Sequence, residues 1–243
     1  METTTRIGMN KTGIKSSPFD TRALLEVSDE AAPSVPGPES ELVALKMSYA
    51  KEADALGSVP PPATVKGTVK SGVDAIKGAR PQVVFDKIAE RLAFERTGVR
   101  LYEALLVKHA ATDGLESIVP AAELVKIRDD EAAHFRLLVE SMESLGGDPT
   151  AQTPCAAATG IAGQGLMQLV NDPRTNFLQS LQALHIAELT DVDGWAMLIE
   201  IARSSGHTKL AEAFQRAEQQ EERHLANVRK WMLGLTKAEL GKA

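Results

Sequence analysis

The sequence contains two short motifs in which a glutamate is followed three residues later by a histidine. They read E-A-A-H, from Glu131 to His134, and E-E-R-H, from Glu221 to His224. On a helix, residues at this spacing lie on one face, about 60° apart, so each pair points into one volume. A single pair of this kind would carry little weight, but two copies predict metal ligands on two different helices.

Two single glutamates occupy corresponding places in other apolar stretches. Glu95 continues the helical spacing of Ile88, and Glu188 continues that of Leu184. Four carboxylates buried at one level would repel one another and take up protons, unless a cation is bound among them. Asp191 lies one turn beyond Glu188 on the same face and is an alternative or additional ligand. Four carboxylates with two imidazoles form an oxygen-rich set that suits two Fe or Mn ions.

Four long amphipathic stretches must position these residues. Their apolar residues recur at alternating spacings of three and four, which predicts helices with one buried face. Each stretch is roughly six or seven turns long, a length more typical of a helical bundle than of an ordinary globular helix. The expected helices span 82–109, 120–145, 175–203 and 208–232.

The connections between these stretches predict their topology. A short loop with Gly114 and Pro120 joins the first helix to the second, and the loop R-S-S-G-H-T-K joins the third to the fourth. The second and third are joined by the long segment 146–174, in which we expect one short helix at 160–170. Two hairpins with one long crossover describe an all-α four-helix bundle of a particular topology.

Residues 1–80 differ from the rest of the chain. They contain the proline-rich segments A-A-P-S-V-P-G-P and S-V-P-P-P-A, and two weakly amphipathic stretches at 40–56 and 63–78. This composition predicts an N-terminal extension that is partly helical or mobile. The bundle domain is expected to span 81–236.

The overall composition restricts the possible partners and compartment. The chain has 243 residues, of which 43% are hydrophobic, and a net charge of −6. This charge offers no general attraction for nucleic acid or an anionic membrane, and no apolar run reaches the ~18 residues of a membrane span. One cysteine, Cys155, and an N-terminus without a signal-peptide pattern favour the cytoplasm.

Residues 82–232 resemble the ferritin-like superfamily, which includes ferritins, bacterioferritins and rubrerythrins. The resemblance rests on the series Glu95, Glu131-x-x-His134, Glu188 and Glu221-x-x-His224. It implies a ferritin-like bundle in which these six residues bind two iron ions that react with O₂ or H₂O₂. It also implies a homodimer or a larger assembly. Manganese fits the same ligands, because sequence rarely separates the two metals.

The same resemblance implies residues around the ligands. Bacterioferritin-like members have a tyrosine seven residues after the first glutamate, as Tyr102 is here, and an aspartate before each E-x-x-H motif. Asp130 matches this pattern. Gln220 departs from it, although its amide oxygen can also accept a hydrogen bond from an imidazole N–H. Together with Asp191, these residues are expected to surround the metal ligands.

Other departures from the family narrow the expected function. A rubredoxin-type module needs four cysteines, so electrons would come from a separate donor or from the substrate. Ala132 stands where bacterioferritins have a haem-ligating methionine, so no haem is expected there. The extension 1–80 is unusual for ferritins that form closed cages.

The main expectation is a non-haem di-iron oxidoreductase of the ferroxidase or peroxidase type. Glu131 and Glu221 would bridge the metals, Glu95 and Glu188 would be terminal or mobile ligands, and each histidine would bind one metal. The alternatives are a dimanganese, catalase-like enzyme, a protein that stores or handles iron without turnover, and a metal-free helical scaffold.

Overall fold

A computed structural model describes residues 13, 15, 17–31, 39–62 and 80–241 of the chain. Within these ranges the regular secondary structure is helical and includes no strand, which confirms the predicted all-α class. None of the described helices combines the length and the apolar character that a membrane-spanning helix needs.

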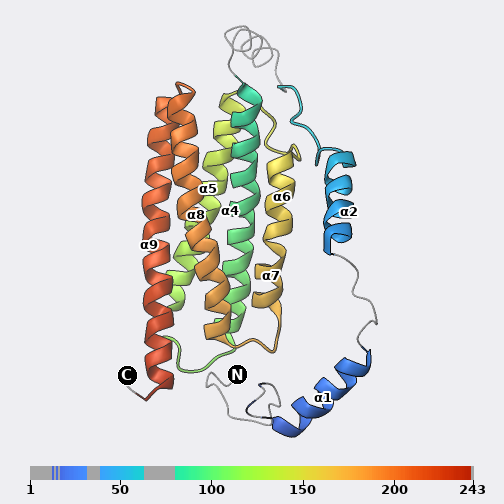
Figure 1. Cartoon of the computed structure of the whole chain (residues 1–243). Coiled ribbons are helices and arrows are strands. Elements are labelled where there is room, and N and C mark those ends of the chain that lie inside the picture. Colours follow the sequence, from blue (N-terminus) through green and yellow to red (C-terminus); the bar gives the residue numbers. More distant parts are fainter. Residues whose placement is uncertain (1–12, 14, 16, 32–38, 63–79, 242–243) are drawn as a thin grey trace. The chain divides into compact units, whose positions relative to one another are not determined.

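Four long helices form a bundle of two hairpins. They are α4 (Pro81–Ala110), α5 (Ala121–Ser144), α8 (Phe177–Ser204) and α9 (Thr208–Glu239). In Figure 1, α4 packs along α5, and α8 packs along α9. The two hairpins meet mainly where α4 contacts α8, and more sparsely where α5 contacts α9.

Local signals in the sequence set the ends of these helices. At the start of α8, the Asn176 side chain accepts a hydrogen bond from the Gln179 backbone N–H, and the Gln179 side chain accepts one from the Asn176 N–H. This reciprocal pair is a capping box. Gly206, with φ of 76°, turns the chain between α8 and α9 in a conformation that glycine adopts readily. The helix α9 continues past the predicted end at 232, because Leu235 extends its buried face.

The crossover from α5 to α8 contains two short helices, α6 (Pro154–Ala162) and α7 (Gln164–Asn171). Both pack against α4, and α7 also packs against α8. The expectation of one helix at 160–170 was therefore wrong. Helix formation begins earlier because Pro154 is well placed in a first turn. The side chain of Thr153 also accepts a hydrogen bond from the Ala156 N–H.

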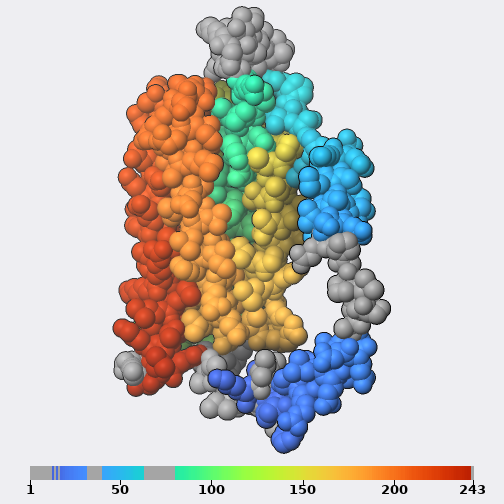
Figure 2. Space-filling view, viewed as in Figure 1, coloured from blue at the N-terminus to red at the C-terminus, as the bar shows by residue number. Residues whose placement is uncertain are grey.

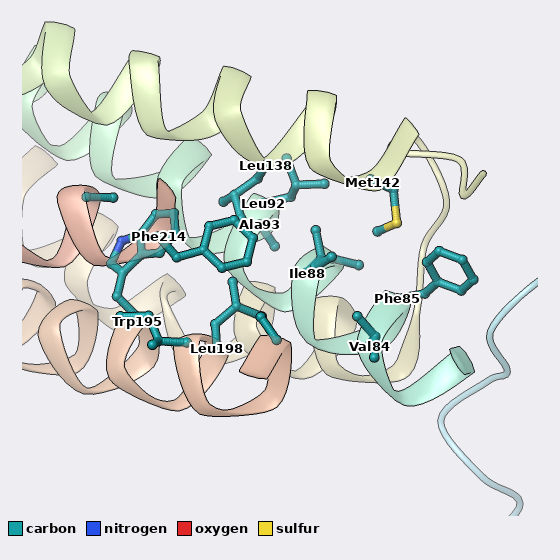
Figure 3. Packing of buried hydrophobic residues seen from close by; sticks show 14 of the residues in the cluster. Val84, Phe85, Ile88, Leu92, Ala93, Leu138, Met142, Trp195, Leu198 and Phe214 are labelled. Carbon is teal, nitrogen blue, oxygen red and sulfur yellow. The ribbon is translucent and has the colours of Figure 1, made fainter. Parts of the chain in front are cut away.

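The apolar core of the bundle is divided into two clusters. Residues of one cluster are drawn in Figure 3 and include Ile88, Leu138, Trp195 and Phe214. Members of the other cluster include Leu105, Leu124, Leu181 and Val228. Along each of the four helices, the predicted metal ligands fall between the two clusters. The core therefore has a polar layer at mid-height, as the spacing of the glutamates predicted.

Near the N-terminus the described residues form α1 (Pro18–Ala31) and α2 (Glu39–Glu52), which belong to a separate compact unit. The helix α2 matches the predicted stretch 40–56, whereas the stretch 63–78 lies outside the described residues. No helix was predicted for α1, although Pro18 in its first turn is a sequence signal for one. Of the described residues, those from Leu56 onward group with the bundle rather than with α1 and α2.

Candidate metal centre

All six predicted ligands lie together in the polar layer of the bundle, and none is more than 3% exposed. Three overlapping sets have potential ligand atoms within 4.8 Å of one another. They are Glu131, Glu188, Glu221 and His224; Glu95, His134 and Glu221; and Glu95, Glu131, Asp191 and Glu221. The structure therefore gathers residues from four helices into one buried cluster. Their role as metal ligands stays a prediction.

Glu221 and Glu131 lie at the centre of this cluster. Glu221 Oε1 lies 2.5 Å from His134 Nδ1, and Glu221 Oε2 lies 2.9 Å from His224 Nδ1. The two oxygens of one carboxylate thus face the two different imidazoles. Glu131 lies near Glu221 in a set with Glu188 and in another with Glu95. A carboxylate that bridged two metal ions would have to occupy such a central place.

A chain of hydrogen bonds joins the outer nitrogens of the two histidines. His134 Nε2 lies 3.2 Å from Gln220 Oε1, and Gln220 Nε2 donates to Asp130 Oδ1 at 3.1 Å. The other oxygen of Asp130 lies 3.2 Å from His224 Nε2. Asp130 and Gln220 therefore each lie beside the outer nitrogen of one of the two histidines.

The donors and acceptors along this chain of hydrogen bonds show which ring nitrogens of the two histidines carry protons. An ionised carboxylate only accepts, so His224 donates from Nε2 to Asp130. Gln220 also donates its amide N–H to Asp130, which leaves its oxygen to accept from His134 Nε2. Both rings then carry a proton on Nε2 and turn Nδ1 toward the carboxylates. Metal-ligating histidines are commonly oriented in this way by an outer acceptor.

Tyr102 holds one oxygen of Glu188. Its hydroxyl donates a hydrogen bond to Glu188 Oε1, and its side chain is almost completely buried. Burial, together with the negative charges of Glu188 and Glu131, raises the pKa of Tyr102 well above its ordinary value. Tyr102 is therefore a neutral donor here. It leaves Glu188 Oε2 as the oxygen without a partner.

Arg91 is a buried cation beside the cluster that sequence reasoning missed. Its Nη2 donates to Glu95 Oε1 at 2.6 Å and also to Asp191, across the interface between α4 and α8. Burial opposes the charge, but Asp191 and Glu95 outweigh it and raise the pKa of Arg91 above its ordinary value. Asp191 thus pairs with a fixed cation. The signal for Arg91 was its place one turn before Glu95.

Five of the six predicted ligands each leave one buried atom without a hydrogen-bond partner. Within the described part of the chain, these atoms are Glu95 Oε2, Glu131 Oε2, Glu188 Oε2, Glu221 Oε1 and His134 Nδ1. The last two lie 2.5 Å apart and form an ion-pair contact, although they lie outside hydrogen-bond geometry. Buried polar atoms are rarely unpaired in native proteins, and a bound ion is one common explanation.

Burial and neighbouring charges shift the pKa values of several groups in the cluster strongly. Burial and the neighbouring carboxylates raise the pKa of Glu131 and of Glu188 well above the usual range. Burial lowers the pKa of His134, but its contacts with Glu221 and Glu95 outweigh this and raise it to about 11. In the absence of a cation these groups hold protons. A metal ion that bound here would have to displace them, so its affinity would rise with pH.

Gly98 on α4 leaves room for the carboxylate of Glu131. A Cβ at this position would overlap Glu131 Oε2 and lie 2.9 Å from Glu131 Cδ. Glycine is a poor helix former in the interior of a helix. Its presence in the middle of α4 is explained by the carboxylate that crosses from α5.

Comparison of the chain with protein-family models, with curated proteins and with solved structures found no significant match. The interpretation of the cluster therefore rests on its residues and their geometry.

Proposed function

We propose that the bundle binds two transition-metal ions, as ferritin-like di-iron proteins do, and acts on O₂ or H₂O₂ as a ferroxidase- or peroxidase-type oxidoreductase. The observation that carries this proposal is the group of five buried ligand atoms that make no hydrogen bond, all within one cluster. Removing several carboxylates from water without a compensating cation is strongly unfavourable. A purely structural bundle would gain more from apolar residues at these positions.

The types of ligand support iron or manganese. Four carboxylates and two imidazoles form a set that hard and borderline divalent ions favour, whereas structural zinc sites usually have four ligands and often contain cysteine. The charges agree with two ions, because four ionised glutamates balance two divalent cations. Arg91 contacts both Asp191 and Glu95, and its single positive charge offsets the additional negative charge of Asp191.

Each predicted ligand has a place in this arrangement. Glu95 and His134 would hold one ion, Glu188 and His224 the other, and Glu131 and Glu221 would lie between the two. A pair of redox-active ions held in this way would supply two electrons to O₂ or H₂O₂.

Hydrogen bonds from the residues around the ligands determine which ligand atoms remain available to a metal ion. Tyr102 occupies Oε1 of Glu188, and Arg91 occupies Oε1 of Glu95, so each terminal carboxylate presents its Oε2. The chain through Asp130 and Gln220 keeps both Nδ1 atoms directed inward. Because the chain has one cysteine, we propose that further electrons come from a separate donor or from the substrate.

Metal analysis of the full chain tests this function. Protein purified without added metal, and then titrated with Fe(II) under anaerobic conditions, should bind about two ions per chain. Addition of O₂ or H₂O₂ should oxidise the bound Fe(II), followed by absorbance and by consumption of the oxidant. Binding of Mn with rapid O₂ evolution from H₂O₂ would favour the catalase-like alternative. Failure to take up either metal would contradict the proposal.

We expect Gly98→Ala to weaken metal binding without unfolding the protein. Alanine favours a helix interior by about 1 kcal/mol over glycine, but the added methyl group would displace the Glu131 carboxylate. The affinity for Fe(II) should fall about 10- to 100-fold, as when residues that orient ligands are replaced. Anaerobic titration measures this loss, and thermal melting checks the fold.

The matched control is Gly160→Ala on α6, where an added Cβ meets no atom within 4 Å. This variant should keep the affinity of the unmodified protein. Equal Fe(II) affinity in the two variants would show that the space beside Gly98 is not needed for metal binding.

A further inference from the structure

A cavity of about 460 Å³ lies beside the candidate metal centre, lined by residues of α4, α8 and the crossover helices. Figure 2 shows the face on which α6 and α7, in yellow, lie beside α4 in green and α8 in orange. The walls are largely apolar and include Phe94, Leu166, Met197 and Leu198. Both the volume and this lining are typical of pockets for small organic molecules.

Small residues line the cavity on two sides. Ala162 and Gly163 lie on its lining where α6 passes into α7, and Gly194 lines it from α8. A Cβ at Gly194 would overlap Arg91 Nη1 and lie 3.0 Å from Arg91 Cζ. The glycine in the middle of α8 is therefore explained by the guanidinium group that reaches this wall.

Arg91 lines the cavity and has hydrogen-bond donors to spare. Among the described residues, both of its hydrogen bonds leave from Nη2, whereas Nη1 lies against Gly194 in the cavity wall. The guanidinium is 4.6 Å from the ring centroid of Phe94, which also lines the cavity. A buried guanidinium has five N–H donors in a fixed plane, and unpaired ones call for an acceptor.

The charges around the cavity favour an uncharged occupant. Glu95 and Asp191 already offset the charge of Arg91. Of the other charged residues in the lining, Lys87 pairs with Glu90 at 2.6 Å, and Asp193 is acidic. A bound carboxylate would therefore meet no net positive charge. An uncharged oxygen can accept a hydrogen bond from Arg91 without being repelled by the acidic side chains.

We propose that this cavity binds a small, uncharged and mainly apolar molecule with one hydrogen-bond-accepting oxygen, such as a phenol, an alcohol or a ketone. Arg91 donates to that oxygen. The same side chain holds Glu95, so the occupant lies one side chain away from the predicted metals. Whether the bound molecule serves as an organic co-substrate rests on the proposed function, but the binding of this molecule in the cavity does not.

The test compares three probes of similar shape: naphthol, naphthalene and naphthoate. Their binding to the full chain is measured by equilibrium dialysis, with metal-free protein and with protein loaded anaerobically with Fe(II). We expect naphthol to bind at about one site per chain and at least about tenfold more tightly than the other two. Equal binding of naphthalene would overturn the role of the oxygen, and tighter binding of naphthoate would overturn the uncharged class.

Two tryptophan variants on α6 locate the site. Ala162 lines the cavity, and Ala162→Trp should weaken naphthol binding at least about tenfold by filling it. Ala158, one turn earlier, is exposed and is not part of the lining, so Ala158→Trp should leave binding unchanged. Both variants should keep the metal content of the parent protein. Undiminished naphthol binding in Ala162→Trp would overturn the assigned site.

Arg91→Lys tests the donor. Lysine keeps the positive charge but lacks the planar fork of donors, so the preference for naphthol over naphthalene should disappear. An unchanged preference would remove Arg91 from the proposal. The two proposals also fail separately: naphthol binding without metal uptake would refute the metal centre alone, and metal uptake without naphthol binding would refute the pocket alone.

Discussion

A variant with Glu131→Ala and Glu221→Ala together is expected to lose metal binding completely. Both carboxylates lie at the centre of the cluster, and Glu221 belongs to the ligand sets of both predicted ions. Replacing a residue that only orients a ligand typically lowers metal affinity 10- to 100-fold, and loss of both central ligands should have a larger effect. Anaerobic Fe(II) titration followed by metal analysis should find no bound iron.

A double variant that still binds about two ions per chain would show that the ligands are wrongly assigned. Loss of binding through unfolding is excluded by isosteric single substitutions studied without metal. Glu131→Gln removes an ionisable group whose Oε2 has no partner, so the metal-free protein should be as stable or more stable. Glu221→Gln removes the partner of both imidazoles and should lower stability by about 1–3 kcal/mol. The free energy of unfolding in urea, measured for each single variant, distinguishes these two effects.

The positions of the candidate ligands could be predicted because helical geometry leaves little choice. Residues three apart share a face, and a hairpin of two long helices returns the chain to the same level. Glu131 with His134, and Glu221 with His224, are therefore brought near the glutamates of the partner helices before any detail of packing matters. The all-α class and the approximate ranges of the first three long helices are confirmed for the same reason, since they follow from periodicity, whereas α9 ends at Glu239 rather than at 232.

Arg91 could not be predicted in the same way. An arginine on an amphipathic helix usually faces solvent or extends its charged end to it. Its burial depends on Asp191 and Gly194, which lie far away in the sequence and are brought opposite it only when α8 packs on α4. The division of the crossover into α6 and α7 was missed for a local reason, because the cap at Thr153 was not weighed against the apolar pattern.

Removal of the buried cation should be the most destabilising single change outside the ligands. Arg91→Met leaves Asp191 and one oxygen of Glu95 buried without their partner. Breaking a buried pair in this way typically costs about 3–5 kcal/mol, because an uncompensated charge remains. The free energy of unfolding of the metal-free variant, measured in urea, should fall by that amount. A decrease in the free energy of unfolding of less than about 1 kcal/mol would show that the Arg91–Asp191 pair contributes no more than a solvent-exposed salt bridge does.

Two further variants separate the charge from the packing. In Arg91→Met with Asp191→Leu, both ends of the pair become apolar, and most of the lost stability should return, because apolar replacement of a buried pair is often neutral or better. Lys87 and Glu90 form a partly exposed pair on the same helix, with about a third of each side chain exposed. Lys87→Met should therefore change stability by no more than about 1 kcal/mol. If Arg91 acted only by filling space, the single and double variants would be equally unstable. Recovery in the double variant would show that Asp191 needs the cation.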